Sequence, residues 1–343
     1  MNTTQLFEHL INGNHLSATQ MQNTIENCMN GTFTDAQIAS FLALMRMKGE
    51  TVAELTSAAT TMQQFAHHVS LGDGLVDIVG TGGDGKNTFN VSTISSFVVA
   101  AAGVRVAKHG NHSVSSRSGS ADLLLQADFK LDLSDSLLNQ CMNQCGIAFL
   151  FAPHFHQAMR HARNARQQLG IRTLFNLLGP LLNPANARKQ VVGVYTSRWL
   201  KPIADVLVNL GSEHALVINS RDGMDEISIA ALTDVVEYRV GEFKNWTIDP
   251  QNFGCRHANL DDIVVQTPAE SLALAESVFA GNKGPARDMI LLNSAAAIYC
   301  ADHASTFQDA IDKAAAAIDS GLAGLKFLQL KALTQQDEDK VHA

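Results

Sequence analysis

The stretch LVDIVGTGGDGKNTFNVSTISSFVVAAAGVRVAKHG, residues 75–110, contains the parts of one βαβ unit. Residues 75–79 have the pattern of a short apolar strand, and the glycine-rich loop GTGGDG follows at 80–85. A capped apolar helix comes next and ends at Gly103, and residues 104–107 have the pattern of a second strand. Parallel strands need such a crossover connection between them. The stretch therefore predicts a parallel sheet with helices on its faces.

The pattern differs on the two sides of this unit. Before residue 70 we expect only helices, because three capping-box pairs each precede a run of helical apolar spacing: Ser17 with Gln20, Thr34 with Gln37, and Thr51 with Glu54. After the unit, helix and strand patterns alternate to about residue 240, with a helix expected over 155–169. The C-terminal third again predicts helices. The fold class is therefore α/β, with a helical N-terminal part.

Composition sets outer limits on function. Of the 343 residues, 46% are hydrophobic and 17% are charged, which is enough to fill a core and excludes a wholly disordered chain. The formal net charge of −8 argues against general nucleic-acid binding. No apolar run is long enough to span a membrane, and the start MNTTQLFEHL predicts no signal peptide. Five scattered cysteines favour a reduced, cytoplasmic protein.

The glycine loop nearly matches two nucleotide-binding motifs. Gly80, Gly82 and Gly85 fit the dinucleotide fingerprint, but no acidic residue follows as far as Ala121 to bind a ribose. The P-loop motif fails because Asn87 stands where a magnesium-binding hydroxyl is needed. What remains is a flexible loop whose backbone N–H groups, with the next helix N-terminus, can hold an anion.

The distribution of charge supports an anion site. Between Gly85 and Ala121, and again between Ser136 and Ala204, the sequence contains no acidic residue. The charged residues of these windows are Lys86, Arg105, Lys108, Arg117, Arg160, Arg163, Arg166, Arg172, Arg188, Lys189, Arg198 and Lys201. This predicts a pocket for a strongly anionic small molecule. Solvated helix faces are the alternative, and they explain Arg160 and Arg163 better.

Further polar groups should meet the loop. Lys108–Asn111 (KHGN) follows the second strand directly, and the carboxyl ends of parallel strands face one crevice. The adjacent acids Asp225 and Glu226 could bind Mg²⁺ together with substrate phosphates, although a solvated acidic loop is an alternative. His154, His156 and His161 could suggest a metal cluster, but partly exposed histidines at a helix start are expected instead.

Several motifs together resemble the anthranilate phosphoribosyltransferase family. They are the GTGGDG loop with TFNVST at 88–93, KHGN at 108–111, VSSRSGSAD at 114–122, RQQLGIRT at 166–173 with FNLLGPLLNPA at 175–185, and MDEIS at 224–228. The resemblance implies a helical domain over 1–70, joined by a return segment near 170–190. It implies an α/β domain over 72–335 with a mostly parallel central sheet flanked by helices. It also implies a homodimer formed through the helical domain.

The implied reaction transfers the phosphoribosyl group of phosphoribosyl pyrophosphate to the amine of anthranilate, a step of tryptophan biosynthesis. The implied donor-binding residues are Gly80, Gly83, Asp84, Thr88, Asn90, Val91, Ser92, Thr93, Lys108, His109, Gly110, Asn111, Ser115, Ser116 and Ser120. Anthranilate would contact Gly80, His109, Asn111 and Arg166, and Mg²⁺ would bind Ser92, Asp225 and Glu226. Lys108 would stabilise the leaving charge, and no covalent intermediate is expected.

Two features depart from the family pattern, namely His112 after KHGN and the sequence NSRDG at 219–223. Two other functions are also considered. The first is a pyrimidine nucleoside phosphorylase, or a phosphoribosyltransferase with another acceptor, on the same scaffold. The second is a polyanion-binding protein, which the negative net charge and the 6% aromatic content oppose.

Overall fold

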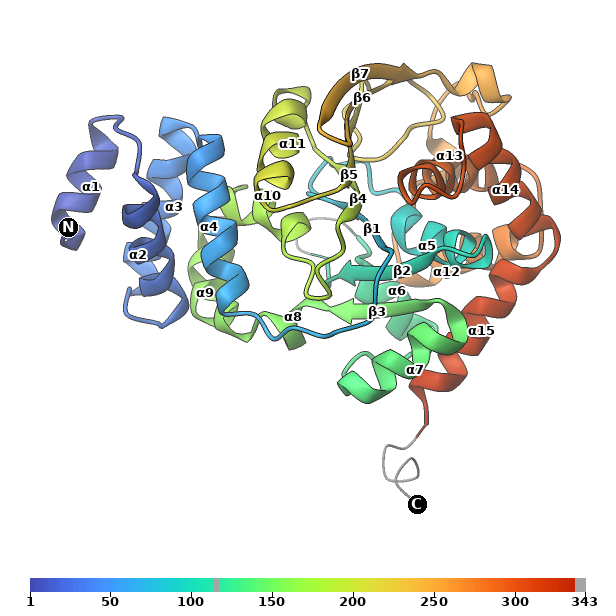
Figure 1. The fold of residues 1–343 in the computed structure, drawn as a ribbon, viewed down its shortest axis with the longest axis horizontal. Helices are drawn as coiled ribbons and strands as arrows, with labels where there is room; N and C mark the ends of the chain where they lie inside the picture. Colours follow the sequence, from blue (N-terminus) through green and yellow to red (C-terminus); the bar gives the residue numbers. More distant parts are fainter. Residues whose placement is uncertain (114–116, 337–343) are drawn as a thin grey trace.

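The computed structural model describes residues 1–113 and 117–336 (Figure 1). The predicted βαβ unit is present as β1 (Leu75–Gly80), α5 (Val91–Ala101) and β2 (Arg105–Gly110). β1 and β2 pair in parallel, with Leu75 opposite Arg105. The α5 crossover is therefore confirmed.

The unit belongs to a seven-stranded sheet with the order β3-β2-β1-β4-β5-β6-β7. The other strands are β3 (Ile147–Phe151), β4 (Lys189–Gly193), β5 (His214–Ser220), β6 (Thr233–Arg239) and β7 (Glu242–Ile248). All pairings from β3 to β5 are parallel, whereas β6 and β7 are added antiparallel. The sheet is thus mostly parallel, as predicted. The strand order reverses between β1 and β4, and in such sheets ligands bind beyond the carboxyl ends at this switch point.

Two hydrophobic cores lie on opposite faces of the sheet. Along β5, Leu216 and Ile218 belong to one core, while Ala215 and Val217 belong to the other, because successive strand residues point to opposite faces. The first core also contains α5 and the C-terminal helices, which pack around it. The second contains α11, which packs on β5 and β6. The helices that flank the sheet are α6 (Ser120–Gln126), α7 (Asp135–Cys145), α11 (Leu200–Asn209), α12 (Pro268–Phe279), α13 (Pro285–Cys300), α14 (Phe307–Asp319) and α15 (Leu322–Thr334).

The N-terminal helices form a bundle at one end of the molecule (Figure 1). They are α1 (Thr3–Ile11), α2 (Ala18–Met29), α3 (Asp35–Lys48) and α4 (Val52–Gln64). The three predicted capping boxes open α2, α3 and α4, and a further box, Asn2 with Gln5, opens α1. The second core continues from this bundle to the sheet, so the bundle packs on the α/β part.

The helix expected over 155–169 is interrupted. The structure has α8 (Ala152–Phe155), a short 3-10 turn, and then α9 (Arg160–Leu169). His156 has φ −114° and ψ 53°, which no helix contains, so the helical hydrogen bonding stops there. α9 packs against α2 and α3, and α10 (Leu174–Leu178) packs against α3 and α4. Chain from the middle of the sequence therefore completes the helical bundle.

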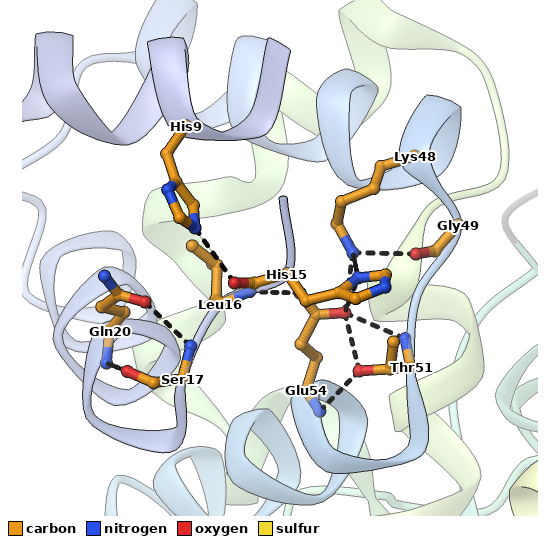
Figure 2. Close-up of polar contacts among 9 residues, drawn as sticks. All are labelled: His9, His15, Leu16, Ser17, Gln20, Lys48, Gly49, Thr51 and Glu54. Carbon is orange, nitrogen blue, oxygen red and sulfur yellow. Dashed lines mark hydrogen bonds and ion pairs between the residues drawn. The ribbon is translucent and has the colours of Figure 1, made fainter. Parts of the chain in front are cut away.

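Figure 2 shows a polar network inside the bundle. The fully buried carboxylate of Glu54 accepts hydrogen bonds from Lys48 Nζ, Leu16 N and Thr51 N at 2.8, 2.8 and 2.9 Å. Lys48 Nζ also lies 2.9 Å from His15 Nδ1. Burial raises the pKa of Glu54, but these hydrogen bonds outweigh it, so the pKa lies below its ordinary value. The network fixes the α1–α2 connection to the start of α4.

Two findings bear on the remaining expectations from composition. Among the residues that the structure describes, no helix has both the length and the apolarity needed to cross a bilayer. All five cysteines are buried and unpaired, and burial raises the pKa of the Cys28, Cys141 and Cys255 thiols to about 12.

Candidate functional site

Three neighbouring strands end in glycine at the switch point. These residues are Gly80 of β1, Gly110 of β2 and Gly193 of β4. A Cβ on Gly80 would lie 2.4 Å from Asp225 Oδ2, and one on Gly193 would lie 1.5 Å from the Asp225 carbonyl oxygen. Only glycine therefore lets the loop that carries Asp225 pack directly on the ends of β1 and β4.

Three acidic residues, Asp84, Asp225 and Glu226, lie close together in the site. Gly82 N donates to Asp225 Oδ2 at 2.6 Å, and Ser92 N donates to Glu226 Oε1 at 3.2 Å. Burial, with the nearby charge of Asp84, raises the pKa of Asp225 to about 7. Burial and the charges of Asp225 and Asp84 raise the pKa of Glu226 well above its ordinary value. The carboxyls crowd one another, and a cation between them would relieve this repulsion.

These groups fit Mg²⁺. The donor atoms are all oxygens, from buried Asp225, half-buried Glu226 and the Ser92 hydroxyl, and Mg²⁺ prefers oxygen ligands. Within 1–113 and 117–336, no three His, Cys, Asp or Glu side chains are grouped so as to hold a metal on their own. Mg²⁺ is usually held by one or two carboxylates acting together with substrate phosphates.

Lys108 lies beneath the same crevice at the end of β2. Its side chain is 2% exposed, and Nζ donates to the His109 carbonyl oxygen at 2.8 Å. Burial lowers the pKa of Lys108, while the charges of Asp77 and Glu226 act in the opposite direction. Buried Asp77 in turn accepts hydrogen bonds from His109 N at 3.1 Å and Asn183 Nδ2 at 2.8 Å. Asp77 and Asn183 thus position the Lys108–His109 segment.

The N-terminus of α5 forms the wall beside the loop. The Asn90 amide accepts hydrogen bonds from Ser118 Oγ at 2.7 Å and Ser271 Oγ at 2.8 Å, and donates to the Ser118 carbonyl at 3.1 Å. Asn90 therefore ties the start of α5 to the serine-rich segment and to α12. Ser92, two residues further on, lines the cavity together with Glu226.

The opposite wall is built by α9 and α10. Arg166 of α9 packs over the Phe175 ring, with its guanidinium carbon 5.7 Å from the ring centroid, and burial lowers its pKa. His109 and His156 pack together with ring centroids 5.2 Å apart, and both Nε2 atoms are buried without a hydrogen-bond partner. Burial lowers the pKa of His156 to about 4 and that of His109 well below its ordinary value. Both rings are therefore neutral near pH 7.

These walls enclose a cavity of about 290 Å³. The described residues predicted from the sequence that line it are Gly80, Gly83, Asp84, Thr88, Asn90, Ser92, Lys108, His109, Gly110, Asn111, Ser120, Arg166, Asp225 and Glu226. Val91 and Thr93 are buried in α5 and do not line it. Ser115 and Ser116 lie outside the described residues. Of the basic residues in the two acid-free windows, only Lys108 and Arg166 line the cavity, whereas Arg160 and Arg163 are exposed.

The sequence analysis missed several residues of this site. Asp77 and Asn183 lie within the quoted segments LVDIVG and FNLLGPLLNPA, but their support of the site, like that of Gly193, comes from contacts between distant parts of the chain. His156 was expected to be partly exposed, but it is buried against His109. His112, where the sequence departs from the family pattern, lines the cavity, and its Nδ1 lies 2.6 Å from Asp122 Oδ1.

Comparisons with known proteins define the class first. The helical bundle domain of the glycosyl transferase family matches residues 4–66, and the a/b domain of that family matches residues 72–324. The protein is thus a two-domain glycosyl transferase.

Whole-chain relatives narrow the class. An anthranilate phosphoribosyltransferase from Legionella pneumophila (strain Paris) is 65% identical over 330 residues, 96% of each chain. One from Hydrogenovibrio crunogenus is 45% identical over 98% of this chain and 99% of its own. The crystal structure of the Thermus thermophilus protein superposes with a TM-score of 0.90 at 35% identity, covering 98% of this chain and all of the other. The chain belongs to the anthranilate phosphoribosyltransferase family.

Solved structures of a yeast relative contain ligands. The Saccharomyces cerevisiae enzyme, 26% identical and with a TM-score of 0.88, was solved with phosphoribosyl pyrophosphate (PRPP) and Mg. Another structure of it, with a TM-score of 0.86, contains 4-fluoroanthranilate. Each covers 97% of this chain.

Proposed function

We propose that the protein transfers the phosphoribosyl group from PRPP to the amine of anthranilate. The products are N-(5-phosphoribosyl)anthranilate and pyrophosphate, in tryptophan biosynthesis. The observation that carries the proposal is one cavity that combines two different sets of groups. The glycine loop, Lys108, Asp225 and Glu226 form a part suited to a pyrophosphate with a cation, and the same cavity is also lined by Arg166, Phe175 and the neutral ring of His109.

For the donor, the main requirement is to stabilise the charge that develops as pyrophosphate leaves C1. The N–H groups of residues 80–85 and of the α5 N-terminus can donate to the phosphate oxygens. Lys108 adds a positive charge, and the hydrogen bond from its Nζ to the His109 carbonyl oxygen positions it. Mg²⁺ bound by Asp225, Glu226 and Ser92 would supply further neutralisation of the leaving group.

For the acceptor, Arg166 provides a cation for the anthranilate carboxylate. Phe175 packs against this arginine and offers an apolar surface to an aromatic ring. Gly80, His109 and Asn111 complete the set of residues that we assign to anthranilate. The aromatic amine is already a nucleophile, so positioning it against C1 is the main task and no covalent enzyme intermediate is needed.

We further propose a helical domain over 1–70, completed by chain returning near 170–190, and an α/β domain over 72–335. A homodimer formed through the helical domain is supported by exposed apolar residues on α1 and α3, Ile11 and Met47. A cytoplasmic location is supported by the reaction class and by the five unpaired cysteines. Neither a nucleic acid nor a membrane is needed as a partner.

The direct test follows anthranilate fluorescence with purified protein, PRPP and Mg²⁺. With folded protein, we expect the anthranilate fluorescence to fall only when PRPP and Mg²⁺ are both present. Folded protein that leaves the fluorescence unchanged would contradict the proposal. Nucleosides with phosphate, or other amine acceptors with PRPP, would then be the substrates to examine on this scaffold.

A further inference from the structure

Arg172 occupies an unusual place beside the glycine loop. It lies between α9 and α10, half-buried, with its guanidinium carbon 4.4 Å from the centroid of the Tyr195 ring. A Cβ added to Gly83 would lie 2.6 Å from Arg172 Nε. The planar guanidinium therefore fills the space between an aromatic ring and the backbone of the loop.

Tyr195 is itself attached to two parts of the molecule. Its hydroxyl accepts hydrogen bonds from Arg46 of α3 at 3.1 Å and from Trp199 Nε1 at 3.0 Å. Its backbone N donates to Thr81 Oγ1 at 3.2 Å, within the glycine loop. Contacts therefore run without interruption from the helical bundle, through Tyr195 and Arg172, to Gly83.

Among the described residues, no carboxylate forms an ion pair with Arg172. In the described part of the chain, the guanidinium of Arg172 stacks on Tyr195. It donates no hydrogen bond to a described acceptor there. Stacking on an aromatic face offsets part of the cost of keeping a cation half-buried. The neighbouring loop is the place where an anion is expected, and a nearby anion would offset the rest.

We propose that Arg172 is a positioning residue for the phosphoribosyl donor. Stacked on Tyr195, it holds Gly83 in the conformation that binds pyrophosphate, places a positive charge behind the loop, and links the loop to α3. Arg172 does not line the cavity, so it acts through Gly83 and does not contact substrate. The inference rests on the donor role proposed above for the glycine loop.

The first experiment compares steady-state kinetics with each substrate varied separately. Arg172→Ala should raise the KM for PRPP about tenfold, the factor produced by ~1.4 kcal/mol, with kcat and the KM for anthranilate changed less than about threefold. Arg172→Lys keeps the charge but loses the planar stack, so it should fall between wild type and Arg172→Ala. The matched control is Arg198→Ala, because exposed Arg198 stacks on the adjacent Trp199 at 5.0 Å and does not line the cavity.

A second set of variants tests the link to α3. Tyr195→Phe keeps the ring under Arg172 but removes the hydroxyl that Arg46 and Trp199 contact. We expect it to raise the KM for PRPP by a smaller factor than Tyr195→Leu, which removes the ring. Combining Tyr195→Leu with Arg172→Ala should add little to either change, since both break the same stack.

Failure of this inference is distinguishable from failure of the proposed function. Wild-type protein without PRPP-dependent loss of anthranilate would reject the function itself. With an active wild type, kinetics of Arg172→Ala like those of Arg198→Ala would overturn the positioning role. The role would also be overturned if Arg172→Ala and Arg172→Lys both changed the KM for PRPP and the KM for anthranilate equally and both lowered the melting temperature. That result would indicate a structural role. Titration of each variant with PRPP and Mg²⁺ gives the donor affinity independently of turnover.

Discussion

Arg166 offers the sharpest test of a single residue in the proposed acceptor site. Its pKa is lowered by burial, so the guanidinium is poorly solvated and should bind a carboxylate strongly. Arg166→Ala should raise the KM for anthranilate about thirtyfold, as expected for loss of ~2 kcal/mol from a charged hydrogen bond. Binding of PRPP, measured by titration calorimetry, should change less than twofold.

Arg163→Ala is the control, because Arg163 is exposed on the same helix and does not line the cavity. Equal losses of anthranilate and PRPP binding in Arg166→Ala would contradict the acceptor assignment. They would indicate instead that Arg166 supports the whole cavity.

Gly193 shows how one missing side chain can control the proposed metal site. A Cβ there would lie 1.5 Å from the Asp225 carbonyl oxygen, so Gly193→Ala must displace the backbone that carries Asp225 and Glu226. We expect Gly193→Ala to weaken Mg²⁺-dependent PRPP binding at least tenfold while the protein remains folded. Circular dichroism checks the fold, and titration with PRPP and Mg²⁺ checks the binding.

Gly324→Ala on α15 is the comparison, since its Cβ would meet Phe279 Cβ at a milder 3.2 Å and it does not line the cavity. Normal PRPP affinity in Gly193→Ala would show that the Asp225 loop can shift without loss of function. The proposed metal ligands would then need to be reassigned.

The polar network of the helical bundle determines how its elements are joined. Removing the charge in Glu54→Gln leaves buried Lys48 without its counter-ion, and breaking such a pair costs about 3 kcal/mol. We expect a comparable fall in the free energy of unfolding near pH 7, measured by urea denaturation. Glu26→Gln is the control, because the half-buried Glu26 accepts a hydrogen bond from Gln22 on the same helix at 2.8 Å and belongs to no ion pair among the described residues.

The pH dependence of this effect has a defined sign. The pKa of Glu54 is lower in the folded protein than its ordinary value of 4.5. The stability it supplies is therefore fully present above about pH 4.5 and is lost as pH falls through the folded pKa. The difference between wild type and Glu54→Gln should shrink below about pH 4.5. A difference that stays constant down to pH 3 would contradict the ionic role of Glu54.

Whole elements were predictable from the sequence where the signal is local. The GTGGDG loop, the α5 crossover and the capping boxes at Ser17, Thr34 and Thr51 each lie within a few adjacent residues. The break in the helix expected over 155–169 was not predicted, because the run keeps helical apolar spacing although His156 turns inward to His109.

Supporting residues of the site were not predictable even where a quoted motif contains them. Asp77 looks like an ordinary strand residue until Asn183 and His109 meet it in the fold. Gly193 is one of 24 glycines, and what requires a glycine there is the close approach of the Asp225 backbone. Contacts between distant segments decide such positions, and a single sequence does not display them.

At the scale of the whole molecule, the bundle presents an apolar surface on α1 and α3. Ile11 is 61% and Met47 is 83% exposed, and the half-buried Phe7 and Leu44 lie one helical turn before them. α1 and α3 pack together, so these residues extend across two adjacent helices. The bundle lies at one end of the molecule, away from the C-terminal helices (Figure 1). Two copies could therefore meet there without covering those helices.

Met47→Lys should separate the proposed dimer, because a charge buried in an apolar interface is costly. Light scattering after size-exclusion chromatography should give a dimer mass for wild type and a monomer mass for this variant at the same protein concentration. Leu328→Lys is the control, since Leu328 is 61% exposed on α15, which lies outside the bundle and also has exposed apolar side chains. Dissociation by Leu328→Lys with Met47→Lys still dimeric would move the interface to α15. A monomeric wild type would reject the dimer altogether, leaving the cavity of each chain to work alone.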